Sequence, residues 1–284
     1  MTIIMNIKEA LTHAADKITL HDARHLMAYI TKIKYSVTYL HENRPLDEKS
    51  YGAFLGAVER RKQGEPLQYI LGSWDFMGMP FITDKRALIP RPETELLVEE
   101  VLAHIRGLDR PANVLDICTG SGCIAVSIAK LSNAKVTAID ICPDALSLAK
   151  ENATLHNVKE KIHFLQSDLL NCLEDEKFDI IISNPPYITA SELNTLQKEI
   201  INHEPQLALN GGEDGMDIYK RLIPQSLKHL TPEGAIFLEI GPVTVKDIME
   251  DTGYGMIRVI NDYAGLDRIL TAKPLLDLQY TRTT

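Results

Sequence analysis

The chain has 284 residues and a net charge of −9, and 45% of its residues are hydrophobic. A chain of this length holds one large domain, or a medium and a small one, and can bury a sizeable core. Its apolar runs fall short of the roughly 18–20 residues that a membrane span needs, so we expect no membrane partner. The acidic charge disfavours a long polyanion such as nucleic acid as a direct partner.

The cysteines and the N-terminal residues both favour a cytoplasmic protein. The first residues lack the basic region and apolar core of a signal peptide. The four cysteines form no CxxC pair and show no ligand-like spacing to histidine, so we expect reduced thiols and no metal site.

Residues 1–65 carry the periodicity of helices and are expected to form a small helical domain. The expected helices span 6–17, then 23–33 with Asp22 as a cap, then 48–63 between an Asp47 cap and a Gly64 stop. The basic run at 60–62 is interpreted as a solvated helix end, favoured by the helix dipole.

Residues 66–90 change character, with glycines separating short runs rich in aromatic and branched side chains. This pattern predicts short strands over 67–71 and 74–82, as a β-hairpin linker between two domains. Two prolines then bracket Arg91, just before a helical run at 96–105. The second of them, Pro92, suits the start of a helix.

From residue 112 onward, strands and helices alternate. Strands are expected at 114–118, 135–140, 162–166, 178–183, 235–240, 256–261 and 268–272, and helices at 123–131, 143–157, 217–230 and 243–251. Such alternation predicts an α/β domain over 91–284, with a parallel, doubly wound Rossmann-like sheet of seven strands. Ligands on such sheets bind at the carboxyl ends of the strands.

The stretch Ser183-Asn184-Pro185-Pro186-Tyr187 follows the fourth strand and carries the most distinctive chemistry. Asn184 offers a carbonyl acceptor and an NH2 donor, the prolines restrict the backbone, and Tyr187 supplies a flat face. This combination suits a grip on a planar NH2 group. An Asn-Pro pair can also simply end a strand and begin a turn, but its place at the ligand-binding edge favours function.

The loop after the first strand, Cys118-Thr119-Gly120-Ser121-Gly122, can bring backbone close to a ligand. The nicotinamide fingerprint is not matched, because Cys118 stands at its first glycine and its third glycine is also missing. A P-loop is excluded because the Gly-Lys-Ser/Thr element is missing. The loop alone therefore leaves the ligand open.

Two aspartates at consecutive strand ends sharpen the interpretation. Asp140 ends the second strand about 20 residues after the glycines, where a carboxylate can accept both hydroxyls of a ribose. Asp168, followed by Leu169, ends the third strand and could bond an adenine amine, although each aspartate alone could be a cap or loop residue. Together they describe an adenosine pocket without a diphosphate cradle, which suits S-adenosylmethionine better than NAD.

The region from Val114 to Asn184 resembles a class I S-adenosylmethionine-dependent methyltransferase, and the wider chain is similar to the release factor glutamine methyltransferases of the HemK/PrmC family. The matching stretches are 66–72, 76–78, 89–95, 114–122, 182–188, 204–209 and 211–215. The Ile-Pro-Arg-Pro-Glu-Thr-Glu and Glu-Pro-x-Leu-Ala-Leu segments are specific to that branch.

The resemblance implies methyl transfer from S-adenosylmethionine to the side-chain amide of the glutamine in the Gly-Gly-Gln motif of peptide chain release factors. The implied cofactor residues are Cys118, Thr119, Gly120, Ser121, Gly122, Asp140, Asp168, Leu169 and Asn184. The implied catalytic residues are Asn184, Pro185 and Tyr187, and the implied substrate-binding residues are these three with Pro186, Arg91 and Glu93. We expect Asn184 Oδ1 and the Pro185 carbonyl to accept the two amide N–H bonds while Tyr187 stacks on the amide.

Two alternatives stay open. An adenine or guanine amino-methyltransferase acting on DNA or RNA would use the same Asn-Pro-Pro-Tyr grip on a flipped base. A non-catalytic S-adenosylmethionine-binding scaffold would bind the cofactor without turnover. For Arg91 and Glu93, an ordinary surface ion pair weighs evenly against a role at the pocket mouth. We expect the chain to act as a monomer.

Overall fold

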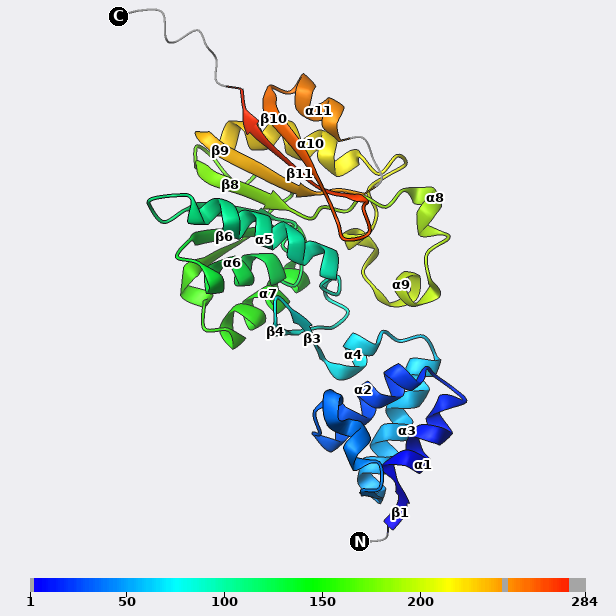
Figure 1. The fold of residues 1–284 in the computed structure, drawn as a ribbon. Helices are drawn as coiled ribbons and strands as arrows, with labels where there is room; N and C mark the ends of the chain where they lie inside the picture. The colour runs from blue at the N-terminus through cyan, green and yellow to red at the C-terminus, as the bar shows by residue number, and fades with distance from the viewer. Residues whose placement is uncertain (1–2, 242–244, 276–284) are drawn as a thin grey trace, which may run out of the picture. The chain divides into compact units, whose positions relative to one another are not determined.

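The computed structural model describes residues 3–241 and 245–275 (Figure 1). The chain divides into two compact units, Met1–Ser73 with Gln197–His203, and Trp74–Leu196 with Glu204–Thr284. The short segment Gln197–His203, which lies in sequence between two parts of the second unit, therefore belongs to the first unit. Among the described helices, none combines the length and the apolar character needed to cross a membrane.

The first unit is mainly helical, as predicted. Its elements are β1 (Ile3–Asn6), α1 (Ile7–Ala15), α2 (Leu20–Thr31), η1 (Tyr35–His41), β2 (Pro45–Asp47), α3 (Glu48–Lys62), α4 (Leu67–Leu71) and α9 (Lys198–His203). Apolar faces of the helices supply its buried core, which includes Leu26, Met27 and Phe54. Asp47 caps α3 as expected, because its Oδ1 accepts the Ser50 N–H at 2.7 Å. The antiparallel pair of β1 and β2 was not predicted.

Two expectations about this unit were wrong. Thr19, rather than Asp22, caps α2, since its hydroxyl oxygen accepts the Asp22 N–H at 3.1 Å. Asp22 instead accepts a bond from Arg61 Nε at 2.9 Å, and Arg61 Nη1 donates to Glu199 Oε2 at 2.6 Å. Arg61, interpreted as part of a solvated helix end, is thus largely buried between two carboxylates and holds α9 within the unit.

The segment from residue 66 to residue 90 is only partly the hairpin that was predicted. Leu67–Leu71 forms helix α4 rather than a strand, because the Pro66 carbonyl accepts the first helical N–H groups and Gly72, at φ +72°, ends the helix. The hairpin is formed by β3 (Ser73–Phe76) and β4 (Met79–Ile82), joined by Met77 and Gly78, which both have positive φ.

The second unit is built on a seven-stranded sheet in the order β10-β11-β9-β8-β5-β6-β7. The strands are β5 (Asn113–Ile117), β6 (Lys135–Asp140), β7 (Ile162–Gln166), β8 (Phe178–Ser183), β9 (Leu230–Glu239), β10 (Tyr254–Asn261) and β11 (Asp267–Pro274). The pairs β5–β6, β6–β7, β5–β8 and β8–β9 are parallel. The Rossmann-like fold is therefore confirmed.

One strand departs from the parallel sheet that was predicted. β11 runs antiparallel to both β9 and β10. The reason is the connection, since a short turn around Gly265 joins β10 to β11 where a parallel neighbour would need a long crossover.

Helices cover both faces of the sheet. These helices are α5 (Pro92–Arg106), α6 (Cys123–Leu131), α7 (Pro143–Leu155), α10 (Asp217–His229) and α11 (Lys246–Asp251). The unit also contains the short helix α8 (Ala190–Leu193) and the 3₁₀ turns η2 (Lys159–Lys161) and η3 (Gln206–Ala208). α5 begins at Pro92, four residues earlier than the helical run predicted, and α6 has the predicted bounds. The predicted helix 243–251 overlaps α11, and its residues 243 and 244 lie outside the described residues.

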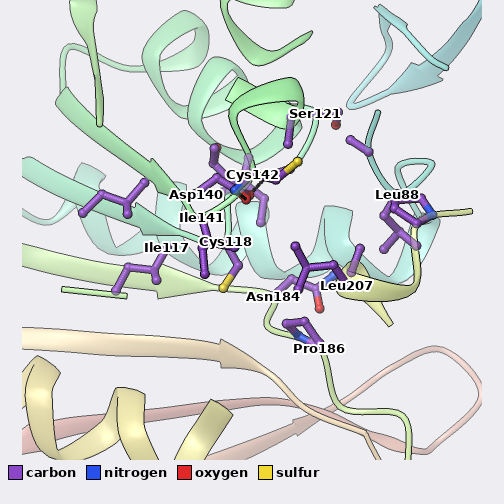
Figure 2. A pocket seen from close by; sticks show the side chains of 18 of the residues that line it. Leu88, Ile117, Cys118, Ser121, Asp140, Ile141, Cys142, Asn184, Pro186 and Leu207 are labelled. Carbon is purple, nitrogen blue, oxygen red and sulfur yellow. Dashed lines mark hydrogen bonds between the residues drawn. The ribbon is translucent and has the colours of Figure 1, made fainter. Parts of the chain in front are cut away.

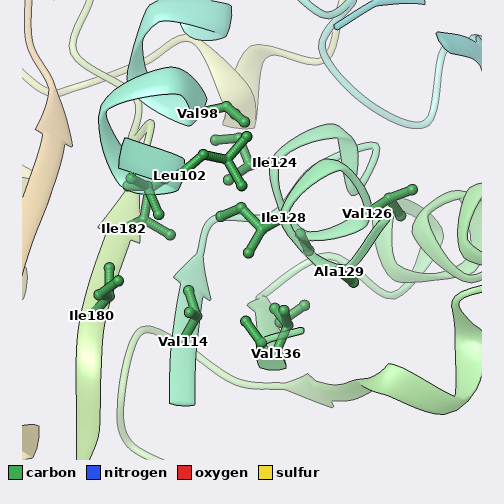
Figure 3. Close-up of a cluster of buried hydrophobic side chains, with 14 of the residues drawn as sticks. Val98, Leu102, Val114, Ile124, Val126, Ile128, Ala129, Val136, Ile180 and Ile182 are labelled. Carbon is green, nitrogen blue, oxygen red and sulfur yellow. The ribbon is translucent and has the colours of Figure 1, made fainter. Parts of the chain in front are cut away.

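The core is split between the two faces by the alternation of side chains along each strand. Ile180 and Ile182 of β8 face α5 and α6 in one cluster, with Val114 of β5 (Figure 3). Ile181 and Leu115 face the opposite side, toward α10 and α11. Strands buried on both faces carry mostly apolar side chains, and the site forms at their ends.

Candidate active site

A cavity of about 270 Å³ opens at the carboxyl ends of β5, β6, β7 and β8 (Figure 2). This is the edge of the sheet where a ligand was expected. The predicted site residues that line it are Arg91, Cys118, Thr119, Gly120, Ser121, Asp140, Asp168, Leu169, Asn184 and Pro186. Gly122, Pro185, Tyr187 and Glu93, also predicted, are not among the lining residues.

The loop between β5 and α6 is held in an unusual backbone conformation. Cys118, Gly120 and Gly122 have φ of +61°, +55° and +78°. Gly122 serves packing, because a Cβ there would lie 2.8 Å from the Cβ of Ala149 in α7. Cys118 adopts a left-handed backbone conformation, which costs about 1–2 kcal/mol for residues other than glycine. Loss of solvation raises the pKa of the partly buried Cys118 thiol, so this group stays neutral.

Asp140, at the end of β6, is joined to this loop. Its Oδ2 accepts the Gly120 N–H at 2.8 Å and its Oδ1 accepts the Cys142 N–H at 2.9 Å. Burial raises the pKa of Asp140, and these backbone bonds oppose that shift. A carboxylate has about four acceptor positions, so each oxygen keeps the capacity to accept a ligand hydroxyl.

Asp168, after β7, has a partner that the sequence did not indicate. Arg221 of α10 donates from Nη2 to Asp168 Oδ2 at 2.5 Å, and both residues line the cavity. The pair is half exposed, so it contributes little to stability. Its effect is geometric, because the ion pair fixes the direction of the carboxylate at the cavity wall.

Asn184 lies where β8 leaves the sheet, and a chain of hydrogen bonds fixes its amide. Asn184 Nδ2 donates to Thr94 Oγ1 at 3.2 Å. Thr94 Oγ1 in turn donates to Glu239 Oε2 at 2.7 Å. Thr94 and Glu239 are both buried, and burial raises the pKa of the Glu239 carboxyl to about 7. Among the bonds of the described residues, Asn184 Oδ1 accepts none, which leaves this oxygen free to bind a ligand in the cavity.

Tyr187 packs closely against two glycines and is not among the residues that line the cavity. A Cβ at Gly241 would lie 2.5 Å from Tyr187 Cδ2, and one at Gly211 would lie 2.6 Å from Tyr187 Cα. Burial raises the pKa of the Tyr187 phenol to about 12, so it stays protonated. Close packing of this ring fixes the backbone that carries Pro185 and Pro186.

Arg91 belongs to a buried ion pair that joins two distant segments. Arg91 Nη2 donates to Glu204 Oε1 at 2.5 Å, and the Ile89 N–H bonds Glu204 Oε2 at 3.2 Å. The Glu204 side chain is 1% exposed. This contact brings Pro205 and Leu207 to the cavity wall. Glu93 is exposed, so the ion pair of Arg91 is made with Glu204 instead.

Several residues of the site were missed from the sequence. They are Thr94, Glu204, Glu239 and Arg221, with the cavity-lining Cys142 and Leu207. Thr94 and Glu204 stand inside the two branch-specific segments, so their segments were recognised while their contacts were not. Glu239 ends an apolar strand, and a charged residue there was the one available signal.

The sheet order and the cavity define a class I methyltransferase fold. A 16S rRNA methyltransferase from T. thermophilus, solved in complex with AdoMet and guanosine, superposes with a TM-score of 0.54 at 20% identity, covering 71% of this chain and 49% of that one. A methyltransferase from Pyrococcus furiosus superposes with a TM-score of 0.52 at 19% identity, covering 70% of this chain and 90% of that one. Likeness at this level of identity establishes the fold.

Sequence relatives define the family. The model of the methyltransferase small domain matches residues 92–213, and that of the PrmC N-terminal domain matches residues 2–72. Release factor glutamine methyltransferases from Thermodesulfovibrio yellowstonii and Clostridium acetobutylicum are 39% and 37% identical to this chain. The alignments cover 88% and 94% of this chain, and 91% and 98% of the relatives. The chain belongs to the release factor glutamine methyltransferase family.

Proposed function

We propose that this protein transfers a methyl group from S-adenosylmethionine to the side-chain amide nitrogen of the glutamine in the Gly-Gly-Gln motif of peptide chain release factors. The observation that carries the proposal is the orientation of Asn184. Its NH2 group is bound to Thr94, so its acceptor oxygen is available at the cavity to bind an NH2 group. The family to which the chain belongs supports glutamine as the source of that NH2 group.

The donor would bind along the ends of β5, β6 and β7. Asp140 would accept the ribose hydroxyls, because its oxygens keep acceptor capacity after binding two backbone N–H groups. Asp168 would accept the adenine amine beside Leu169, with Arg221 fixing its carboxylate. Cys118, Thr119, Gly120 and Ser121 would line the remainder of the donor, and Gly122 would support them by packing on α7. When bound, the sulfonium donor supplies an activated methyl group.

The acceptor amide is a weak nucleophile, because resonance draws its nitrogen lone pair into the carbonyl. Asn184 Oδ1 and the Pro185 carbonyl would accept its two N–H bonds, which aims the nitrogen at the methyl group. The same bonds would stabilise the positive charge that the nitrogen gains in the transition state. Tyr187 would contribute by holding this backbone rigid, and stacking of its ring on the amide stays a prediction.

The protein substrate would reach the cavity past Pro186, Arg91 and the Glu204–Leu207 segment. We propose that Glu93, which is exposed and lies two residues after Arg91, contacts the substrate directly. The N-terminal helical unit would bind the release factor away from its glutamine. We further propose that the enzyme acts in the cytoplasm as a monomer, without direct contact to nucleic acid.

A label-transfer experiment tests the function. The protein is incubated with S-adenosylmethionine labelled in its methyl group and, separately, with a release factor, its Gly-Gly-Gln Gln→Ala variant, DNA or RNA. We expect label on the wild-type release factor alone. Label on DNA or RNA would support the base-modifying alternative, and label that survives the Gln→Ala change would place the reaction on another residue. Donor binding without any transfer would indicate a scaffold.

A further inference from the structure

The buried carboxyl of Glu239 has no part in the proposed transfer as described so far. It ends β9 and is 2% exposed, next to the 2% exposed Thr94 in the first turn of α5. A buried carboxyl is costly unless its hydrogen-bonding capacity is used. Here its hydrogen-bond donor is Thr94, the same residue that receives the amide of Asn184.

The chemistry of the Thr94 hydroxyl determines which group donates and which accepts in the hydrogen bonds that join Asn184, Thr94 and Glu239. Thr94 has a single proton, and an ionised Glu239 can only accept it. Thr94 Oγ1 can then only accept from Asn184, so the group that faces it must be the Asn184 NH2 rather than its oxygen. The order of donors is thus Asn184 to Thr94 to Glu239, with distances of 3.2 Å and 2.7 Å. The ionised carboxylate therefore determines which end of the Asn184 amide points away, toward the cavity.

We propose that Thr94 and Glu239 are positioning residues for methyl transfer, which fix Asn184 in the one amide orientation that presents an acceptor oxygen to the substrate NH2 group. This inference rests on the proposed function. Turned by half a rotation, Asn184 would present its own NH2 to the NH2 of the substrate, and two donors cannot bond. The pair acts through Asn184: Glu239 is not among the residues that line the cavity, and Thr94, which is among them, bonds Asn184.

The surroundings of Glu239 place its titration near neutrality. Burial raises the pKa of Glu239 most strongly, and Glu93 adds to this. The hydrogen bond from Thr94 and the charges of Arg268 and Arg91 lower it, which gives a pKa of about 7. Tyr187, Tyr219 and Cys123 also lie within electrostatic range and are neutral, because burial raises the pKa of each. Tyr219 Oη donates to the Glu239 backbone carbonyl at 2.7 Å and so leaves its carboxylate free.

Protonation of Glu239 can reverse the donor and acceptor roles in the hydrogen bonds that join Glu239, Thr94 and Asn184. A neutral carboxyl can donate to Thr94 Oγ1, which frees the Thr94 proton to bond the Asn184 oxygen and stabilises the turned amide. The productive orientation is therefore present above the pKa of Glu239 and is lost as the pH falls through it.

Substitution of Thr94 gives the first test, with kcat, the KM for a release factor and the donor Kd measured for each variant. Thr94→Val removes the hydroxyl at nearly constant volume, and we expect kcat to fall about 10- to 100-fold, as for other groups that orient a reacting residue. KM and donor Kd should stay within about threefold, since Val keeps the volume of the side chain at the cavity wall and removes only the hydrogen bonds to Asn184 and Glu239. Thr94→Ser keeps the hydroxyl and should restore kcat to within about threefold of wild type.

A matched control removes a buried hydroxyl elsewhere. Ser226 is fully buried in α10 and bonds Tyr254 at 2.8 Å, so Ser226→Ala should lower stability and leave kcat unchanged. The inference is overturned if Thr94→Val keeps the wild-type kcat, or if Thr94→Ser is as impaired as Thr94→Val. It is equally overturned if Ser226→Ala lowers kcat as much.

Glu239→Gln gives a second test that does not depend on Thr94→Val folding. We expect the wild-type kcat to fall as the pH drops below about 7. In Glu239→Gln this acid limb should be absent, because the side chain no longer titrates, and kcat should lie below the wild-type plateau at every pH, because a neutral amide can donate to Thr94 as well as accept from it. An acid limb unchanged in Glu239→Gln would overturn the inference. Failure of the proposed function is distinguishable, because the wild-type protein would then leave the release factor unlabelled before any variant is compared.

Discussion

The two sides of the cavity are built in different ways. The proposed donor side consists of Cys118, Gly120, Asp140 and Asp168, which come from successive strand ends, and Asp140 accepts hydrogen bonds from two backbone N–H groups. The proposed acceptor side consists of Asn184, Thr94 and Glu239, whose hydrogen bonds join side chains 90 and 145 residues apart along the chain. A local sequence pattern can predict the residues of the donor side, because each follows a strand. It cannot predict the acceptor side, because those residues meet only in the folded domain.

This difference predicts a division of labour. Asp140 and Asp168 on the donor side would bind a ligand of constant chemistry, so their effect should fall on binding. Side chains on the acceptor side orient one amide, so their effect should fall on the rate of transfer.

Loss of the Asn184 amide should have the largest effect. Asn184→Ala removes the proposed acceptor for the substrate N–H, and we expect kcat to fall about 10²- to 10³-fold, as when one preorganised bond to the transition state is lost. The measurement is steady-state methylation of a release factor. Asn194→Ala, which alters an exposed amide bonded only to Ala190 O within its own helix, should keep the wild-type kcat. A loss shared by both variants would break the comparison.

Loss of the Asp140 carboxylate should have the next largest effect, and this effect should fall on the dissociation constant of the donor rather than on kcat. Asp140→Ala should raise the donor Kd about 10- to 100-fold, because a charged acceptor for the ribose and two backbone N–H groups lose their partner. Titration calorimetry with S-adenosylmethionine measures this. Asp144→Ala changes an exposed acid four residues away, and its donor Kd should match the wild type. Unchanged donor binding in Asp140→Ala would remove Asp140 from the donor side.

The pair of Arg91 and Glu204 should matter mainly for stability. Glu204→Ala leaves a partly buried Arg91 and the Ile89 N–H without their acceptor, and we expect a loss of about 2 kcal/mol in the free energy of unfolding. Urea denaturation measures it. The exposed pair of Asp214 and Lys220 is the control, and Asp214→Ala should change stability little. Equal losses in the two variants would show that the buried pair is no more important than a surface one.

The strain at Cys118 should give the smallest effect. Glycine tolerates the φ of +61° at this position, so Cys118→Gly should be about 1 kcal/mol more stable than Cys118→Ala. Elsewhere in a chain glycine is ordinarily the less stable of the two, because it loses more freedom on folding. Paired urea denaturation curves decide the sign. An alanine variant at least as stable as the glycine variant would mean that the loop relaxes.

Much of the fold could be predicted from local patterns. The strand over 178–183 and the helix over 123–131 have the bounds expected, because buried runs and helical spacing are strong signals. Leu67–Leu71 was misjudged as a strand, since five residues rich in Leu and Ile fit either state and the preceding Pro66 decides for a helix. The Thr19 cap was missed because Asp22, three residues later, offers an equally good cap chemistry.

The residues of the candidate site likewise divide into those that local sequence patterns predict and those that only long-range contacts reveal. Asp140 and Asn184 could be selected because each follows a predicted strand and carries chemistry suited to its place. Thr94 and Glu239 could not, since a threonine in a first helical turn and a glutamate at a strand end are ordinary alone. Only the bond between them, across α5 and β9, gives them a role.

The most direct test of this division measures donor Kd and kcat side by side for Asn184→Ala and Asp140→Ala. The account predicts that Asn184→Ala keeps the donor Kd within about threefold while kcat falls at least about 100-fold. Asp140→Ala should show its larger change in donor Kd. Equal losses of kcat and donor affinity in Asn184→Ala would make Asn184 a packing residue and contradict the account.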